Sequence, residues 1–266
     1  MFKPGISSKL MQGYSLSEIL SCASEIGFGG AELWMHQVQE SGMGAAELKK
    51  LAADLGVVLQ VHMDTRDVNL ASTNRVIREA SLHQVMSAID FAADLEARVV
   101  TVHPGRITGE KEPILVGTLW EYQIEAFALL ARRAEDRGVL IGAENMEKRP
   151  NEFVLTEADA AKIVRAVGSD SLGTTLDVAH LDSVCNVPEA VAAWSLPIVN
   201  IHVSQSGARM HLPIFDDEAG NIDFKRVFPL LASKYSGLLI VEGYVRGRER
   251  ENFLRSYEWL ERICKR

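Results

Sequence analysis

The chain has 266 residues, 47% of them hydrophobic, which suits one (β/α)8 barrel of about 250 residues and also allows two smaller domains. Glycine and proline are scattered along the chain rather than gathered in low-complexity tracts, which argues against disorder, collagen and coiled coil. The net charge of −8, from 28 Lys and Arg against 36 Asp and Glu, argues against a nucleic-acid-binding protein, because such proteins usually need a basic face.

Seven apolar segments rich in β-branched residues predict strands, and several of them begin at Gly or Pro. They span residues 30–35, 56–62, 97–103, 138–145, 171–177, 197–203 and 237–243. A weaker first strand is expected within residues 2–12. The nearly continuous apolar character of these segments is typical of parallel strands that are buried on both faces.

Segments with helical periodicity separate the predicted strands. They span residues 15–26, 74–95, 118–136 and 157–167. Helices before two of the strands are expected to stop at Gly56 and Gly138. Repeated alternation of strand and helix predicts a parallel sheet, and eight units predict a closed (β/α)8 TIM barrel as one domain over residues 1–266. A doubly wound open sheet is the alternative, although no GxGxxG follows the first strand.

Six consecutive predicted strands end in a residue that can bind a metal or transfer a proton. These residues are His62, His103, Glu144, Asp177, His202 and Glu242. Any one of them alone would more often be structural, but strand ends converge on one face of a barrel, where active sites lie. Mixed histidine and carboxylate ligands suit Zn²⁺, Mn²⁺ or Co²⁺, and the absence of cysteine argues against a closed structural zinc site.

The ordered motifs VHMDTRDVNLAS, VTVHPG, GAEN, LDVAH, NIHVSQ, HLPI and IVEG, spread over residues 25–245, resemble the xylose-isomerase-like TIM-barrel superfamily. That superfamily contains sugar and sugar-phosphate isomerases and epimerases, and also abasic-site nucleases of the endonuclease IV type. The resemblance implies a metal-dependent enzyme whose site lies at the carboxyl ends of the strands. No single motif carries this resemblance; the order of the whole set does.

The resemblance to ketose 3-epimerases implies one divalent ion (Mn²⁺, Zn²⁺, Co²⁺ or Mg²⁺) held by four residues from the last four strands. By position these are Glu144, Asp177, His202 and Glu242. The two glutamates would also be the catalytic acid and base. The resemblance further implies that His180 and Arg209 bind substrate oxygens. His62 and His103 are expected to bind substrate or, together with His211, to add further metal ligands.

The resemblance to the nuclease branch extends to eight of the nine residues that bind three zinc ions there. They are His62, His103, Glu144, Asp177, His180, His202, His211 and Glu242. The ninth ligand is an aspartate in that branch, and here its position holds Arg209. A guanidinium has no lone pair to offer a metal. This departure and the acidic charge balance disfavour the nuclease activity.

We therefore expect a metal-dependent isomerase or epimerase that acts on a small keto-sugar, polyol or sugar phosphate by proton transfer next to a metal-bound carbonyl. The alternatives are a zinc-dependent phosphodiesterase of the endonuclease IV type, a keto-inositol dehydratase-like lyase, and a non-catalytic sugar-binding protein. Intact Glu144 and Glu242 argue against the last of these. Dehydration, isomerisation and epimerisation are not separated by the sequence.

Several weaker features bear on substrate and location. Arg246 follows the last strand, where barrels often bind phosphate, but it also suits a solvated helix face. Glu32 and Trp34 end the second predicted strand, and Asn145 is a candidate supporting residue. Three scattered cysteines and the lack of a signal peptide or membrane-spanning segment predict a cytoplasmic protein. We expect the protein to bind a small carbohydrate substrate and to bind neither nucleic acid nor a membrane. A homo-oligomer is possible.

Overall fold

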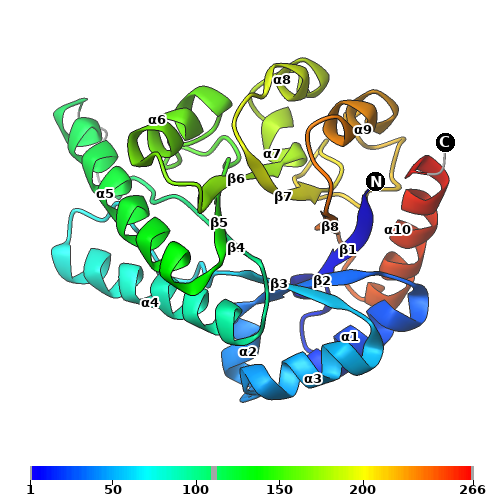
Figure 1. Cartoon of the computed structure of the whole chain (residues 1–266). Helices are drawn as coiled ribbons and strands as arrows, with labels where there is room; N and C mark the ends of the chain where they lie inside the picture. The colour runs from blue at the N-terminus through cyan, green and yellow to red at the C-terminus, as the bar shows by residue number, and fades with distance from the viewer. Residues whose placement is uncertain (1, 109–112, 265–266) are drawn as a thin grey trace.

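The computed structural model describes residues 2–108 and 113–264, and its strands form a closed parallel barrel surrounded by helices (Figure 1). The strands are β1 Lys3–Ser7, β2 Gly30–Trp34, β3 Val58–His62, β4 Val99–Val102, β5 Leu140–Glu144, β6 Leu172–Asp177, β7 Ile198–Val203 and β8 Leu238–Val241. Each strand pairs with the next, and β8 pairs with β1. This closure confirms the predicted (β/α)8 barrel and excludes the open sheet.

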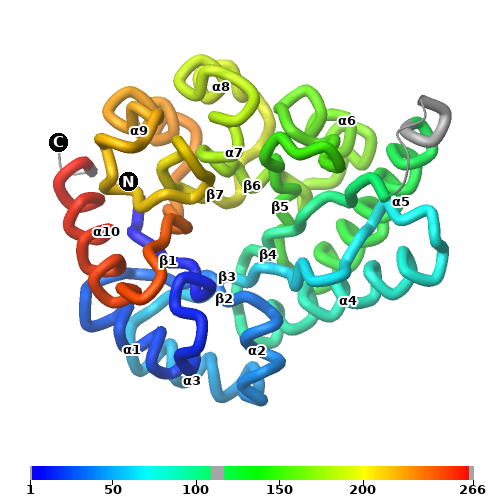
Figure 2. Tube along the Cα trace, turned by 180° about the vertical axis from the view of Figure 1, so that it is seen from behind, coloured from blue at the N-terminus to red at the C-terminus, as the bar shows by residue number. Residues whose placement is uncertain are grey.

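The helices lie outside the barrel, as the view from behind also shows (Figure 2). They are α1 Leu16–Ile26, α2 Met35–Ser41, α3 Ala45–Leu55, α4 Arg75–Asp94, α5 Pro113–Arg137, α6 Glu157–Val167, α7 Val178–Asp182, α8 Val187–Ala193, α9 Phe224–Ala232 and α10 Glu249–Cys264. A short 3-10 helix, η1 Ser8–Met11, follows β1. The last helix, α10, contacts β1, so the first strand and the last helix lie beside the same part of the barrel.

Local signals in the sequence account for several helix boundaries. Ser15 caps α1 and forms a capping box with Glu18, so the first turn has partners for its free backbone groups. Gly56 and Gly138 both adopt positive φ, of 69° and 67°, at the ends of α3 and α5. Glycine adopts this left-handed conformation without steric cost, which is why the predicted helix stops occur there.

The structure shifts some predicted boundaries by a few residues. The expected first strand within 2–12 becomes β1 followed by η1. His103 and Glu242 come directly after their strands, and His202 is the next-to-last residue of β7. Within the predicted loop 104–117, residues 109–112 lie outside the described part and α5 begins at residue 113. The predicted long loop 204–223 is irregular and carries two isolated bridges.

Two further observations concern the helices and the thiols. Among the described helices, none is both long enough and apolar enough to cross a membrane. Cys22 is buried and Cys185 is exposed, and both are free thiols. The side chain of Cys264 lies outside the described part of the chain.

Candidate metal centre and active site

Four strand-end side chains converge on one point at the carboxyl face of the barrel. Glu144, Asp177, His202 and Glu242 each offer a ligand-type atom, and these four atoms all lie within 4.8 Å of one another. Glu144 and Asp177 end β5 and β6, and the other two residues lie at the ends of β7 and β8. Because parallel strands end on the same face, the barrel brings together residues up to 98 positions apart.

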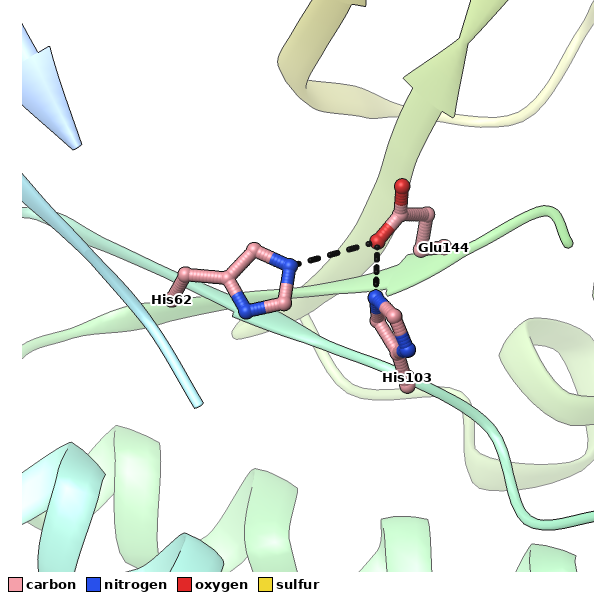
Figure 3. A group of neighbouring side chains, drawn as sticks. All are labelled: His62, His103 and Glu144. Atoms are coloured by element: carbon pink, nitrogen blue, oxygen red, sulfur yellow. Dashed lines mark ion pairs between the residues drawn. The ribbon is translucent and has the colours of Figure 1, made fainter. Parts of the chain in front are cut away.

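Glu144 connects this group to a second one, which includes two histidines from β3 and β4 (Figure 3). Its Oε2 lies 2.9 Å from Nε2 of His103 and 3.6 Å from Nε2 of His62. His62, His103 and Glu144 form a candidate metal group of their own. Nδ1 of His62 donates to the backbone carbonyl of Met63 at 2.8 Å, so its Nε2 is the nitrogen that presents a lone pair to this group.

A third candidate group consists of Asp177, His180 and His211. Nε2 of His180 and Nε2 of His211 face each other at 3.3 Å. Nδ1 of His180 donates to the carbonyl of Asn145 at 2.8 Å, and Nδ1 of His211 lies 3.1 Å from the hydroxyl of Ser204. Each ring is thus held through one nitrogen while the other faces the site. The structure therefore brings together all eight histidine and carboxylate residues that the sequence analysis singled out.

Asp177 is fixed from two sides. Its Oδ1 accepts from the backbone N–H of His180 at 2.8 Å and so caps α7. Asn145 bonds both backbone groups of Asp177, because its Oδ1 accepts from the amide N–H at 2.9 Å and its Nδ2 donates to the carbonyl at 3.0 Å. Such support keeps a ligand in one orientation. Asn145 therefore has the supporting position that the sequence predicted.

Burial and neighbouring charges set the ionisation of the group. Burial opposes the charge on Glu144, but His103 and His202 outweigh it and hold the pKa of Glu144 well below its usual range. Burial also disfavours the charge on His202, yet Glu242, Glu32 and Glu144 raise its pKa well above the ordinary value. Without a bound cation, the group therefore favours a protonated His202 among ionised glutamates.

The pKa values of Asp177 and His211 shift in the opposite sense from those of Glu144 and His202. Burial raises the pKa of Asp177 to about 6; His180 opposes this shift, and the charges of Glu144 and Glu242 add to it. Burial and the neighbouring His180 lower the pKa of His211 to about 3. Asp177 therefore carries a poorly compensated negative charge at neutral pH, while His211 is a neutral imidazole that can act as a ligand.

Buried carboxylate oxygens without donors show that the residues fit a divalent cation. Oδ2 of Asp177 and Oε1 of Glu242 are buried and have no hydrogen-bond partner among the described residues. Buried carboxylate oxygens are costly unless they are paired or bind a metal. Three carboxylates with one imidazole form a donor set that suits Mn²⁺, Co²⁺ or Zn²⁺. The candidate metal centre therefore offers unpaired carboxylate oxygens to a cation, in addition to side chains that lie close together.

A cavity of about 450 Å³ opens beside Glu242 and His211. Its wall includes Lys9 from η1 and Tyr244 and Arg246 from the segment after β8. The ammonium group of Lys9 lies 3.8 Å above the ring of Trp34. The cavity lies at the carboxyl end of the barrel, where substrates of this fold bind.

Arg209 does not join the eight clustered residues. Its side chain is exposed, and its guanidinium donates to the backbone carbonyls of His211 at 3.4 Å and Tyr244 at 3.0 Å. It therefore ties the long segment after β7 to the segment after β8. The structure places this predicted substrate-binding residue at the rim.

Two residues of β2 have contacts that the sequence did not predict: Glu32 in the middle of the strand, and Trp34 at its end, which was expected to pack on a sugar face or on the barrel rim. The ring of Trp34 stacks on His62 with centroids 3.7 Å apart, and its Nε1 donates to Ser7 at 2.9 Å. Glu32 is fully buried, and its Oε2 lies 3.0 Å from Nε2 of His202. A glutamate inside an otherwise apolar strand was the only available signal for this contact.

Known proteins share this architecture. A sequence model of the xylose isomerase-like TIM barrel family matches residues 20–263. An uncharacterized protein of Methanocaldococcus jannaschii is 28% identical over 250 residues, covering 90% of this chain and 83% of that protein. D-psicose 3-epimerase of Agrobacterium fabrum is 20% identical over 229 residues, covering 84% and 77%. The crystal structure of a D-tagatose 3-epimerase-like protein superposes with a TM-score of 0.86 at 26% identity, covering 99% of this chain and 97% of the other.

Proposed function

The chain belongs to the xylose isomerase-like TIM barrel family, and within it we propose a metal-dependent isomerase or epimerase of a small keto-sugar. The observation that carries this proposal is the convergence of Glu144, Asp177, His202 and Glu242 within 4.8 Å. Two of these residues are glutamates from different strands, Glu144 from β5 and Glu242 after β8, which suits proton transfer on carbon next to a carbonyl. The similarity to sugar 3-epimerases supports the same substrate class.

In the proposed reaction, Glu242 and Glu144 exchange a proton with the substrate. Glu242 lines the cavity, and its Oε1 has no hydrogen-bond partner among the described residues, so this atom is suited to take up the proton. Glu144 is held by His202 and His103. For epimerisation it would first take up a proton from solvent and then deliver that proton to the carbon, while Glu242 releases the proton it removed back to solvent. Two carboxylates can serve both faces of one carbon, as epimerisation requires.

The ligand residues would hold the metal and fix the geometry around it. Asp177 and His202 are fully buried and complete the group that the two glutamates share. When bound, a divalent ion supplies electrostatic stabilisation for the negative charge that develops on adjacent substrate oxygens. The Nε2 atoms of His180 and His211 face each other, and both histidines form a candidate metal group with Asp177, which suits a contact to substrate oxygens or to a further ion.

One observation favours a second candidate, a zinc-dependent phosphodiesterase. The four-residue group shares Glu144 with one of the other two candidate metal groups and Asp177 with the other, an arrangement that suits several metal ions acting together. Against this candidate, Arg209 occupies the position of an anionic ligand and turns its guanidinium toward backbone carbonyls. The net charge of −8 also disfavours a DNA substrate. We therefore keep the keto-sugar enzyme as the proposed function.

The test combines metal analysis with a substrate screen. Protein purified without chelator is assayed for bound metal, loaded in turn with Mn²⁺, Co²⁺ and Zn²⁺, and incubated with free ketoses and their phosphates. We expect at least one bound equivalent and conversion of a ketose to its epimer or aldose isomer. A metal-loaded protein that converts no ketose but cleaves an abasic duplex would overturn the proposal in favour of the phosphodiesterase.

A further inference from the structure

Glu32 places a fully buried carboxylate inside the barrel, next to the candidate metal centre but away from the cavity. Its Oε1 lies 2.8 Å from the hydroxyl of Thr101 and 2.8 Å from Nδ2 of Asn200. Its Oε2 lies 3.0 Å from Nε2 of His202. A buried carboxylate is stable only when donors surround it, and the proton transfer proposed above does not use this one.

A count of hydrogens decides which nitrogen of His202 carries a proton. The two hydrogens on Nδ2 of Asn200 have acceptors in Glu32 at 2.8 Å and Thr101 at 3.0 Å, while Nε2 of His202 is farther away at 3.1 Å. Both hydrogens are therefore used by the nearer oxygens. Oε2 of Glu32 is buried and makes no hydrogen bond with the described residues, and it faces Nε2 of His202 at 3.0 Å. A hydrogen on Nε2 would therefore satisfy this carboxylate oxygen. Nδ1 is left to face Glu144 and Glu242, at 3.1 Å and 3.5 Å.

The other two buried histidines of the cluster are held in a different way. His62 and His180 each donate from Nδ1 to a backbone carbonyl and turn Nε2 toward the site. His202 is turned around, with Nδ1 in the site and a carboxylate behind Nε2. A charged acceptor binds the ring N–H more strongly than a neutral carbonyl and makes the opposite nitrogen a better electron donor.

We propose that Glu32 is a positioning residue that fixes His202 in the tautomer whose Nδ1 binds the metal. Glu32 does not line the cavity and belongs to none of the candidate metal groups, so it would act only through His202. This inference rests on the metal centre of the proposed function. According to this inference, the affinity of the centre for a metal ion depends on Glu32 from β2, a strand that contributes no proposed ligand.

The variant Glu32→Gln tests this role with a side chain of nearly the same shape. Its amide nitrogen must face either Nδ2 of Asn200, where two donors collide, or Nε2 of His202. In the second case the amide donates to Nε2 and leaves the hydrogen on Nδ1, where it blocks ligation. We expect the affinity for Co²⁺, titrated by its visible absorption, to fall by about 10- to 100-fold, the usual effect of losing such a partner.

Thr175→Val is the matched control. Thr175 is also fully buried in the barrel interior, and its hydroxyl contacts Thr101 and the carbonyl of Gly142 but neither Glu32 nor His202. This variant should bind Co²⁺ with nearly wild-type affinity. Equal affinity losses in both variants would overturn the positioning role, because they would reflect general disturbance of the barrel.

A direct readout on the wild type avoids any dependence on how the variant folds. Long-range ¹H–¹⁵N spectra of the zinc-loaded protein should show His202 with a protonated Nε2 and a metal-bound Nδ1. A protonated Nδ1 with metal on Nε2, or wild-type Co²⁺ affinity in Glu32→Gln, would overturn this inference alone. A wild type that binds no divalent metal would overturn the metal centre and this inference together.

Discussion

Glu144 and His202 face each other, with Oε1 of the glutamate 3.1 Å from Nδ1 of the histidine. In the metal-free protein this contact is an ion pair, because the pKa of Glu144 is lowered and that of His202 is raised. A metal ion needs the lone pair of the same Nδ1 atom. Metal binding and protonation of His202 are therefore competing events at one atom.

This competition predicts how metal affinity depends on pH. Because the folded-state pKa of His202 is raised, its stabilising charge is fully present below about pH 6.5 and is lost as the pH rises through the raised value. Binding must expel that proton, so affinity should rise about tenfold per pH unit up to that pKa. Below about pH 6 Asp177 must lose a proton too, and the dependence should steepen. Calorimetric titration with Mn²⁺ from pH 5.5 to 8 measures it, and a flat profile would contradict the ion pair.

Asp177→Asn should stabilise the metal-free protein while weakening metal binding. The folded-state pKa of Asp177 is raised to about 6, so its contribution to stability is fully present below its unfolded value and is lost as the pH rises through 6. A shift of about two units corresponds to at most about 3 kcal/mol. In chelator at pH 8, we expect the variant to have a higher melting temperature than wild type. On adding Mn²⁺, its melting temperature should rise less than that of wild type.

The control for that experiment is Asp170→Asn, an exposed carboxylate before β6 that belongs to none of the three candidate metal groups. It should change neither the melting temperature in chelator nor the gain on adding Mn²⁺. If Asp177→Asn melted below wild type in chelator and kept the full gain with Mn²⁺, Asp177 would be structural rather than a ligand.

Glu144→Gln and Glu242→Gln should each lower kcat by about 100-fold or more, the range expected for loss of general acid–base catalysis. Both side chains are also proposed ligands, so metal occupancy must be measured in every preparation. Glu218→Gln removes an exposed carboxylate from the long segment after β7 and serves as the control. A fully metallated Glu242→Gln enzyme with wild-type turnover would remove that residue from the proton transfer.

The barrel and the cluster were predictable because both follow from strand order. Parallel strands in a barrel end on one face, so His62, Glu144 and Asp177 had to meet once the strands were recognised. The error of one residue at His103 and Glu242 did not matter, since a side chain just past a strand still points toward the same face. Short helices such as α2 and α8, with 7 residues each, lack the periodicity needed to predict them.

The supporting contacts were not predictable, because they depend on register across the barrel. Asn200 donates to Glu32 across 168 positions of the sequence, and the residues around each of them contain no local pattern that would predict this hydrogen bond. The direction of Arg209 depends on an irregular segment in which His211 adopts a positive φ of 55°. Hydrophobic periodicity predicts strands and helices, but it does not predict the conformation of an irregular segment like this one. Sequence reasoning therefore found the residues of this segment but not the direction of Arg209.

Lys9 and Arg246 should favour substrates that carry an anionic group at the end away from the metal. Both line the cavity beside Glu242, and neither forms a salt bridge within the described part of the chain. A charge-assisted hydrogen bond is worth about 1.5–3 kcal/mol, or roughly tenfold or more in binding. We expect KM for a ketose phosphate to be lower than for the free ketose, and Arg246→Gln to reduce that preference.

The matched control is Arg248→Gln, because Arg248 is exposed nearby but pairs with Glu251 at 3.9 Å and does not line the cavity. It should leave both KM values unchanged. If the free and phosphorylated ketoses had equal KM values and Arg246→Gln changed neither, Arg246 would belong to a solvated surface, which is the other interpretation of its sequence position.

The last prediction concerns Arg209 and separates the two enzyme classes. Its guanidinium donates to the carbonyls of His211 and Tyr244 and so holds the segment that carries His211 against the segment after β8. Each such bond contributes about 1 kcal/mol net, so Arg209→Ala should loosen this part of the rim and lower kcat/KM for the small substrate several-fold. Metal content should stay unchanged, because Arg209 belongs to none of the three candidate metal groups.

Two measurements accompany that variant. Elemental analysis compares metal content in wild type, Arg209→Ala and Arg226→Ala, an exposed arginine on α9 that serves as the control. An abasic duplex is then incubated with each metal-loaded protein, and we expect no incision, because Arg209 has no lone pair to offer a third zinc ion and belongs to none of the candidate metal groups. Efficient incision by the wild type would overturn the keto-sugar enzyme. Loss of metal in Arg209→Ala alone would mean that the rim contact, rather than the strand ends, holds the third group of ligands in place.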